Sequence, residues 1–507
     1  MSLESLIKKL EKVMRKDSGI DGTAQRLAQI VWLIFLKVFD YKEEEAELTT
    51  DGYEPIIPEG YRWRDWALGN SVKDQLTGPD LLDFINNELI PVLGGNPITM
   101  NGKRVVLFSK TDARSMMVKD FMGDCVNYMK NGYLLREVIN LFNDVQFEDS
   151  DEAHEFNNMY ETLLGGLQAA GKMGEYYTNR AITDFAISKL DPKIGEILAD
   201  WAMGTGGFLI SALNHMQKQI APGDTEKQMC LQTAVRGGEW KPMAYKLGVT
   251  NLILHGIDLP NVRYGDSLSE KKFSDFKGKD LVDCCALNPP YGGVALAEDL
   301  ASFPAEIRSS ETADLFTALA IKRLKATGRG VIVLPDGFLF GTDNAKVAIK
   351  KYVLKECNLH TIIRLPQSCF APYTDIATNL LFFDKGEKTH GIWFYRLDMP
   401  EGYIHFSKTR PMKRSHFAEV DEWWDDRHEI SDEKADDSLN TTYKSKYYSI
   451  EEIKAANYNI DLCGYPVEEK IILSPEETMV NFVKRRAELD KLMDEKLEAI
   501  KALLGGI

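Results

Sequence analysis

Seven short strand-like runs alternate with helix-length segments from about residue 151 of this 507-residue chain, and this alternation limits the fold more than any other feature. Each run has the length of a buried strand, and turn residues follow it. Strands that alternate with helices form a mostly parallel, doubly wound α/β sheet with helices on both faces. The expected strands end near Asp200, Gly238, Tyr264, Asn288, Pro335, Pro366 and Phe383. The last two are expected to form a hairpin at the sheet edge.

The chain on either side of this alternation has other patterns. Apolar residues recur at helical spacing from Leu6 to Phe39 and from Phe121 to Phe142, so residues 1–150 are expected to form a helical domain. Residues 418–438 are rich in Asp, Glu and Trp and predict an exposed acidic connection. Residues 466–507 repeat apolar positions near 3.5 spacing, which predicts a long C-terminal helix. That helix could bind a partner subunit or fold back on its own chain. The α/β domain would then span residues 151–465.

One expected strand ends in the motif Asn288-Pro289-Pro290-Tyr291. Open α/β sheets bind ligands at the carboxyl ends of their strands. The Asn288 side-chain oxygen and the Pro289 carbonyl are two acceptors that could hold one amino group, and Tyr291 offers a flat face for a planar ring. The motif therefore suits a planar, weakly nucleophilic nitrogen such as the exocyclic amine of a base. Asn and Pro are also turn formers, so a plain strand-ending turn is the alternative.

A glycine-rich turn follows the expected strand that ends at Asp200. The turn contains Gly204, Thr205, Gly206 and Gly207, and a helix is expected from Phe208 to Met216. Such a strand–turn–helix element lets a cofactor approach the backbone closely. The longer Gly spacing of dinucleotide enzymes and the Gly-Lys-Ser/Thr of a P-loop are both missing. An ordinary tight turn remains the alternative.

Two acidic residues stand at further expected strand ends. A carboxylate at Glu239 suits the two hydroxyls of a ribose, and the neighbouring Trp240 could pack on a purine ring. Asp266 could accept a hydrogen bond from an adenine amino group. Taken singly, each acid is more often a solvated surface charge. Their order along the chain favours the interpretation that they bind a nucleoside together.

Charge and cysteine usage narrow the classes of function. The formal net charge is −16, which predicts that the chain does not hold DNA alone, because a protein that grips DNA neutralises phosphates with basic residues. Lys408, Arg410, Lys413 and Arg414 form a local basic cluster that is either a binding face or a solvated loop. Seven cysteines lack zinc spacing, so we expect no metal site, and Cys284 and Cys285 are expected in the core. Secretory and membrane-spanning patterns are also missing, which predicts a cytoplasmic protein.

Together these residues resemble the amino-group methyltransferases that use S-adenosylmethionine. The glycine turn, Glu239, Asp266 and the Asn-Pro-Pro-Tyr motif occur in the order found in that class. Residues 174–180 are similar to the Gly-x-x-Tyr/Phe-Thr-Pro-Arg segment of adenine-N6 DNA methyltransferases, with Asn179 in place of Pro. Over roughly residues 1–465 the chain resembles the modification (M) subunit of type I restriction–modification systems. The similar stretches are residues 33–37, 59–63, 156–161, 328–337, 364–366 and 378–386.

The resemblance implies S-adenosyl-L-methionine as cofactor and N6 of a flipped adenine in duplex DNA as target. It implies cofactor contacts by Tyr177, Thr178, Asp200, Gly204, Thr205, Gly206, Gly207, Phe208, Glu239, Trp240 and Asp266. Transfer would take place at Asn288, Pro289, Pro290 and Tyr291. Tyr291 and Phe370 would stack on the base, although Phe370 could equally anchor a loop on the core.

The resemblance also implies partners. A specificity (S) subunit would join two M subunits on double-stranded DNA, and restriction (R) subunits could join them. Two alternatives stay open: methylation of another planar nitrogen (a glutamine side chain, cytosine N4 or an RNA base), and a non-catalytic scaffold. Trp201 and Met203 are bulkier than the residues usual beside the glycine turn.

Overall fold

The computed structural model describes residues 3–68, 76–144, 177–371, 374–407, 410–431, 443–462 and 464, and five pairs of residues between 479 and 494. The domain boundaries expected near residues 150 and 465 lie outside these ranges, as do residues 156–161 and 174–176. The five pairs near the C-terminus are helical, and the remainder of the expected C-terminal helix also lies outside the described residues.

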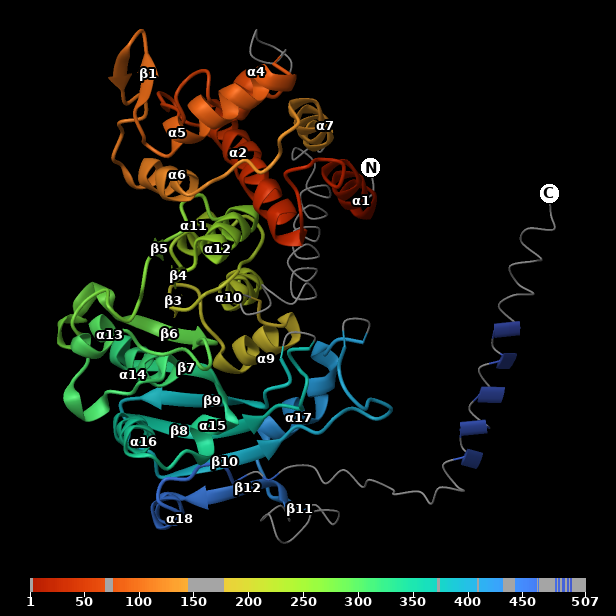
Figure 1. Cartoon of the computed structure of the whole chain (residues 1–507). Coiled ribbons are helices and arrows are strands. Elements are labelled where there is room, and N and C mark those ends of the chain that lie inside the picture. The colour runs from red at the N-terminus through yellow and green to blue at the C-terminus, as the bar shows by residue number, and fades with distance from the viewer. Residues whose placement is uncertain are drawn as a thin grey trace.

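A ten-stranded sheet forms the centre of the α/β part, as the alternation predicts (Figure 1). The strands lie in the order β11-β12-β10-β8-β9-β7-β6-β3-β4-β5. The pairs β3–β4, β3–β6, β4–β5, β6–β7 and β8–β10 are parallel, and the other four are antiparallel. The strand bounds are β3 Leu198–Asp200, β4 Val235–Glu239, β5 Val262–Tyr264, β6 Val282–Leu287, β7 Leu324–Pro335, β8 Cys357–Arg364, β9 Thr378–Lys385, β10 Gly391–Arg396, β11 Ile430–Ser431 and β12 Tyr443–Ser449.

All seven expected strands are present, and each ends within two residues of its expected position. The expected β8–β9 hairpin is antiparallel, but its predicted place at the sheet edge is wrong. Strand β9 lies between β7 and β8, and β10, β12 and β11 extend the sheet beyond β8. Strand β12 reads Tyr-Lys-Ser-Lys-Tyr-Tyr-Ser and carries little apolar signal, whereas β10 reads Gly-Ile-Trp-Phe-Tyr-Arg, an apolar run that was not among the expected strands.

Helices cover both faces of the sheet because its strands are apolar on both sides. In β6, Cys284 and Cys285 are both fully buried but lie in cores on opposite faces, as alternation along a strand requires. The core with Cys284 includes side chains of α9, α10 and α12, and the core with Cys285 those of α14 and α16. The helix bounds are α9 Arg180–Leu190, α10 Gly207–Gln217, α11 Thr225–Leu231, α12 Pro242–Leu254, α13 Ala297–Ser302, α14 Thr312–Arg323, α15 Asp336–Phe340, α16 Asn344–Glu356, α17 Ala418–Asp425 and α18 Ile450–Ala455.

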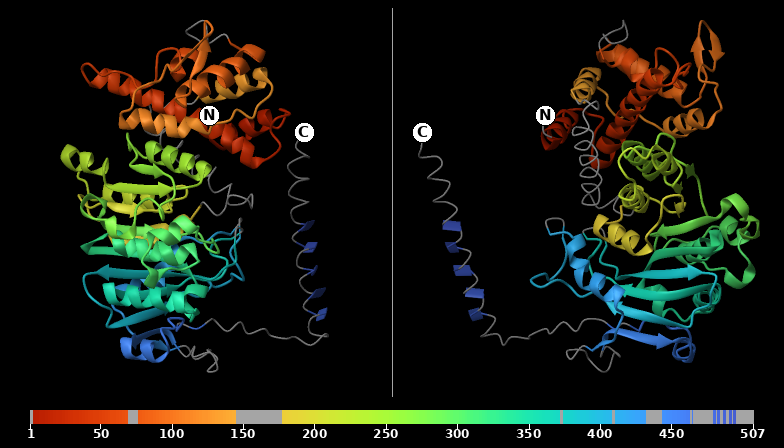
Figure 2. Two further views of the ribbon diagram at one scale, coloured as in Figure 1. Left: turned by 60° about the vertical axis from the view of Figure 1, so that its left-hand side comes forward. Right: turned by 180° about the vertical axis from the view of Figure 1, so that it is seen from behind.

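The N-terminal part is helical, as predicted, apart from one small hairpin, and it lies at one end of the α/β part (Figures 1 and 2). Helix α2 packs against α12, Lys42 forms an ion pair of 2.6 Å with Asp258, and the Tyr264 hydroxyl lies 3.0 Å from Asp124 Oδ2. Among the described residues, no helix is long and apolar enough to cross a lipid bilayer. The bounds are α1 Leu3–Met14, α2 Thr23–Thr49, α3 Trp63–Trp66, α4 Gly78–Asp83, η2 Phe84–Leu89, α5 Ile90–Leu93, β1 Ile98–Met100, β2 Lys103–Val105, α6 Ala113–Gly123 and α7 Gly132–Asn143.

The acidic segment expected to be an exposed connection is partly a packed helix, so that expectation is wrong for residues 418–425. Helix α17 buries Val420 and Trp423. The Trp423 ring lies 4.8 Å from the ring of Tyr395 and 5.9 Å from that of Trp393, both in β10. Trp423 therefore anchors the segment to the added strand β10, while the neighbouring Trp424 packs on His360 of β8 and Phe382 of β9.

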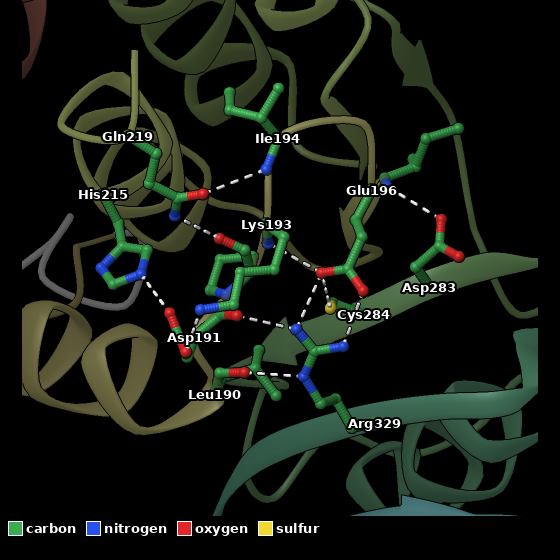
Figure 3. A network of polar contacts seen from close by, with 12 residues as sticks. Leu190, Asp191, Lys193, Ile194, Glu196, His215, Gln219, Asp283, Cys284 and Arg329 are labelled. Carbon is green, nitrogen blue, oxygen red and sulfur yellow. Dashed lines mark hydrogen bonds and ion pairs between the residues drawn. The ribbon is translucent and has the colours of Figure 1, made fainter. Parts of the chain in front are cut away.

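A polar network joins α9, β3, β6 and β7 at the edge opposite the carboxyl ends of the parallel strands (Figure 3). Arg329 forms two hydrogen bonds with the Glu196 carboxylate, at 2.7 and 2.9 Å. It also donates to the carbonyls of Leu190 and Asp191 at 2.7 and 2.8 Å. Asp283 accepts from the backbone N–H of Ile197 at 3.0 Å. Burial alone would raise the pKa of Glu196, but the hydrogen bonds from Arg329 lower it below its usual range.

Arg329→Met is expected to lower the free energy of unfolding by roughly 1–3 kcal/mol at pH 7, because the two carbonyls and Glu196 lose their donor. A carboxyl whose pKa is lowered by folding stabilises the protein above its unfolded pKa and loses that effect as the pH falls. The difference between wild type and variant should therefore shrink toward pH 4, measured by urea unfolding. Arg15→Met, at an exposed i,i+4 pair with Glu11, is the matched control and should change stability by less than about 0.5 kcal/mol.

Candidate active site

Asn288 directly follows β6, at the carboxyl end of the parallel strands. Its Nδ2 donates to Thr178 Oγ1 at 3.2 Å. Thr178 in turn lies beside Gly207, the first residue of α10. The Thr178 carbonyl oxygen is 3.7 Å from the position that a Cβ on Gly207 would occupy. The structure thus brings the predicted amide next to the predicted glycine turn through a residue 110 positions away in sequence.

The other members of the Asn-Pro-Pro-Tyr motif have distinct environments. The Tyr291 hydroxyl donates to the Asn288 side-chain oxygen and to the Val333 carbonyl, the latter at 3.2 Å. Thr312 Oγ1 donates to the Pro290 carbonyl at 3.1 Å. Within the described residues the Pro289 carbonyl receives no hydrogen bond, so it keeps its acceptor capacity. Burial raises the pKa of Tyr291, which keeps it a phenol that can donate at neutral pH.

The glycine turn is held by a carboxylate from the next strand. Glu239 Oε2 accepts from the backbone N–H of Gly204 at 2.9 Å, and Oε1 accepts from Lys241 N–H at 2.7 Å. Gly204 and Gly206 have φ values of 54° and 81°, a left-handed backbone that favours glycine. Asp200, expected to order the turn, accepts from Ala202 N–H at 3.0 Å. Burial raises the pKa of both Asp200 and Glu239.

Two features of the turn fit a polar nucleoside cofactor. Helix α10 begins at Gly207 without a side-chain cap, so the first backbone N–H groups of the helix are available to an anionic or polar group. Among the residues that the structure describes, none hydrogen-bonds the buried Thr205 hydroxyl, while the Thr205 carbonyl accepts from Asn251 Nδ2 at 2.9 Å. A buried hydroxyl is normally satisfied, so this one indicates a ligand that completes the site.

The bulky neighbours of the turn point away from it into the two cores. A Cβ at Gly237 would lie 2.6 Å from Met203 Sδ, and one at Gly248 would lie 2.6 Å from Met203 Cε. These two glycines therefore make room for Met203. The Trp201 ring stacks at 4.8 Å from the guanidinium of Arg323, on the opposite face. Neither side chain needs to occupy cofactor space.

The remaining predicted cofactor residues differ in exposure. Trp240 is 52% exposed, which leaves a ring face for a purine. Asp266 Oδ1 accepts from Leu268 N–H at 2.8 Å. Tyr177 is half-buried against the core, while Phe208 and Phe370 are buried in it. Phe208 can thus reach a ligand only through its backbone, and Phe370 anchors its loop on the core in this structure. Both keep their predicted roles as hypotheses.

Sequence reasoning missed Asp299, which lies against Asp266 and is 2% exposed. One Asp299 oxygen accepts from Leu296 N–H at 2.7 Å, and the other receives no hydrogen bond from the described part of the chain. Burial raises the pKa of Asp299, and the charges of Asp266 and Glu298 raise it further against the bond from Leu296. No motif marks this residue, since only the fold of α13 brings it to Asp266.

Asp299→Asn is expected to stabilise the protein by about 1 kcal/mol at pH 8, because the amide can donate to Asp266. A carboxyl whose pKa is raised by folding stabilises at low pH and loses that effect as the pH rises through the folded pKa. The advantage of the variant should therefore grow between pH 5 and pH 8 in thermal unfolding. A gain in stability that does not change with pH would contradict the explanation that ionised Asp299 destabilises the protein beside Asp266.

Comparisons with known proteins identify the family of this chain. The N-6 DNA Methylase family matches residues 151–471. The methylase subunit of the type I restriction enzyme EcoEI from Escherichia coli is 42% identical over 508 residues, covering 100% of this chain and 99% of that protein. A modification subunit from Vibrio vulnificus YJ016 has a TM-score of 0.75 at 35% identity, covering 92% and 96% of the two chains. A chain of the type I R-M system has a TM-score of 0.77 at 30% identity, covering 99% and 98%.

An open α/β sheet with a glycine turn, a carboxylate that holds this turn and an Asn-Pro-Pro-Tyr motif at adjacent strand ends defines a methyltransferase that acts on amino groups. The chain belongs to the N-6 DNA Methylase family, among the methylase subunits of type I restriction enzymes. The motif alone does not distinguish between the possible target nitrogens, but membership in this family does. The chain is an adenine-specific DNA methyltransferase rather than an enzyme for another nitrogen or an inactive scaffold.

Proposed function

We propose that this chain transfers the methyl group of S-adenosylmethionine to N6 of an adenine flipped out of duplex DNA. The observation that carries the proposal is the hydrogen bond from Asn288 to Thr178, which joins the amide to the start of α10. The target amine and a cofactor over the glycine turn would then be neighbours. The cofactor supplies an electrophilic methyl group when bound. A chain mixed with labelled cofactor, its specificity partner and duplex DNA should label adenine, and label only in protein or RNA would refute the proposal.

The residues of the motif would act by position and charge. The Asn288 oxygen and the Pro289 carbonyl accept the two N6 hydrogens, which orients the nitrogen and stabilises its growing positive charge. In the present structure the Asn288 oxygen accepts from the Tyr291 hydroxyl, so that hydroxyl must turn away when the amine enters. The same movement would free the Tyr291 ring to stack on the base. Flipping costs a few kcal/mol, and stacking returns roughly 1–3 kcal/mol.

The cofactor would be held by groups from three strand ends. Glu239 accepts from the ribose hydroxyls, Asp266 from the adenine amine, and Trp240 packs on the ring. Glu239 would also couple ribose binding to the turn, because it already accepts from Gly204 N–H. The Thr205 hydroxyl and the first N–H groups of α10 remain for the polar tail of the cofactor.

Glu239→Gln is expected to weaken cofactor binding about tenfold at pH 8, since the ribose hydroxyls lose a charged acceptor. Burial raises the pKa of free Glu239, and the bound state favours the ionised form. Wild-type affinity should therefore be constant at high pH and fall as the pH drops through that raised pKa, whereas the variant should lack this fall. Calorimetric titration from pH 5 to 8 measures both, with exposed Glu306→Gln as control. Wild-type affinity in the Glu239 variant would contradict the assignment.

The assembly is also part of the proposal. The relatives are subunits, and this chain is acidic overall, so we propose that a specificity subunit supplies sequence choice and joins two copies of this chain, with restriction subunits as further partners. The division into residues 1–150, 151–465 and 466–507 is proposed as helical domain, methyltransferase domain and subunit-association helix. The family match to residues 151–471 supports the middle unit.

A further inference from the structure

The described parts of the loop after β10, residues 397–407 and 410–417, expose two basic side chains that have no acidic partner within the described residues. These are Arg410 and Lys413, which we call the basic pair. Arg414 in the same loop behaves differently, because it binds the Asp421 carboxylate at 2.6 and 3.0 Å. In a chain of net charge −16, two unneutralised cations on one loop indicate an anionic partner.

The loop lies at the same sheet edge as Asn288. Strand β10 is parallel to β8, and β8 is antiparallel to β9. Strand β9 is antiparallel to β7, which is parallel to β6. Strands β6 and β10 therefore run in the same direction, and their carboxyl ends lie at the same edge of the sheet. Figure 1 shows the loop projecting beyond the side toward which the arrows of β6 and β10 point. Phe406 N–H donates to Ser368 Oγ at 2.9 Å, which fastens the loop to the one that carries Phe370.

The loop holds the basic pair in place rather than leaving it to be ordered by a ligand. Phe406 is 2% exposed and stacks on His416, with ring centres 5.5 Å apart. Ser407 and Arg410 exchange two backbone hydrogen bonds of 3.1 Å. The Arg410 guanidinium stacks on Tyr403 at 4.1 Å from the ring centre, and its Nη2 donates to the Gly402 carbonyl at 3.3 Å. Within the described residues its other N–H groups remain for planar acceptors. A charged group that is already positioned loses less entropy on binding.

We propose that the basic pair binds two backbone phosphates of the DNA that flanks the flipped adenine. This inference rests on the proposed function and adds a phosphate-binding surface to it. DNA is favoured over a protein partner because the loop stands at the edge where the base must enter, and because guanidinium and ammonium groups suit phosphate oxygens. The loop would offset locally the repulsion between an acidic chain and a polyanion.

The test is DNA binding by the full chain with its specificity subunit, measured by fluorescence anisotropy over a series of salt concentrations. Each phosphate contact contributes about 0.9 to the slope of log K against log salt, so R410A/K413A should lower the slope by about 1.8. The same variant should weaken binding by roughly tenfold at moderate salt. The charge-conserving R410K/K413R should retain the wild-type slope. Cofactor affinity should be the same in all variants.

K355A/K388A is the matched control, because Lys355 and Lys388 are exposed at the opposite sheet edge. Its slope should equal that of wild type. A wild-type slope in R410A/K413A overturns the inference. If that variant also assembles more weakly with the specificity subunit while the slope is unchanged, the loop binds protein instead of DNA. Failure of the wild-type complex to methylate adenine would instead refute the proposed function, so the two failures are distinguishable.

Discussion

Asn288→Ala is expected to slow methyl transfer to duplex DNA by roughly 10²–10³-fold while cofactor binding is retained. The Asn288 oxygen is the acceptor that follows β6 and lies at the start of α10, so its loss removes charge stabilisation at the reacting nitrogen. The glycine turn is held independently by Glu239, which explains why the cofactor should still bind. Single-turnover transfer of labelled methyl groups measures the first effect, and calorimetric titration of the cofactor measures the second.

Asn344→Ala is the matched control, because that asparagine is exposed at the start of α16. It should transfer methyl groups at the wild-type rate. More than a tenth of wild-type activity in the Asn288 variant would remove this amide from the chemistry. Loss of cofactor binding in that variant would show that Asn288 supports the pocket through Thr178 instead.

Tyr291→Ala is expected to lower kcat/KM for DNA by about 5–150-fold, the equivalent of 1–3 kcal/mol of base stacking. Tyr291→Phe should keep most activity or raise it slightly. The tyrosine hydroxyl donates to the Asn288 oxygen in this structure, so phenylalanine leaves that oxygen free for the target amine while it keeps the ring. Steady-state kinetics with duplex DNA measure both variants, and fluorescence of 2-aminopurine at the target position reports base flipping.

An equal loss in the two Tyr291 variants would contradict this account. The hydroxyl and its bond to the Val333 carbonyl would then be the essential feature, and the ring would act only in packing. Thermal unfolding separates the cases, because a packing role predicts that alanine destabilises the chain more than phenylalanine does.

Much of the sheet was predictable because its central strands are buried on both faces. Runs such as Val331 to Leu334 are apolar without alternation, which marks a parallel strand covered by helices. Strand β11 has two residues and β12 buries only Ser445 and Tyr448, so their residues look like loop, and the apolar strand β10 was not among the expected strands. Without them the β8–β9 hairpin looked like the sheet edge. The Trp423 contacts of α17 depend on β10 and were hidden for the same reason.

The sequence alone determined the order along the chain of the glycine turn, Glu239, Asp266 and the Asn-Pro-Pro-Tyr motif. Turn and polar residues mark these strand ends even at β4 and β5, which are not apolar runs. Only the tertiary structure decided which groups touch: Thr178 with Asn288, Tyr291 with the same amide, Asp299 with Asp266, and Met203 with Gly237 and Gly248. Strand and turn signals are local in sequence, whereas these contacts, apart from that of Tyr291 with Asn288 inside one motif, join residues from separate elements. Their geometry depends on how helices and strands pack, which no short stretch of residues encodes.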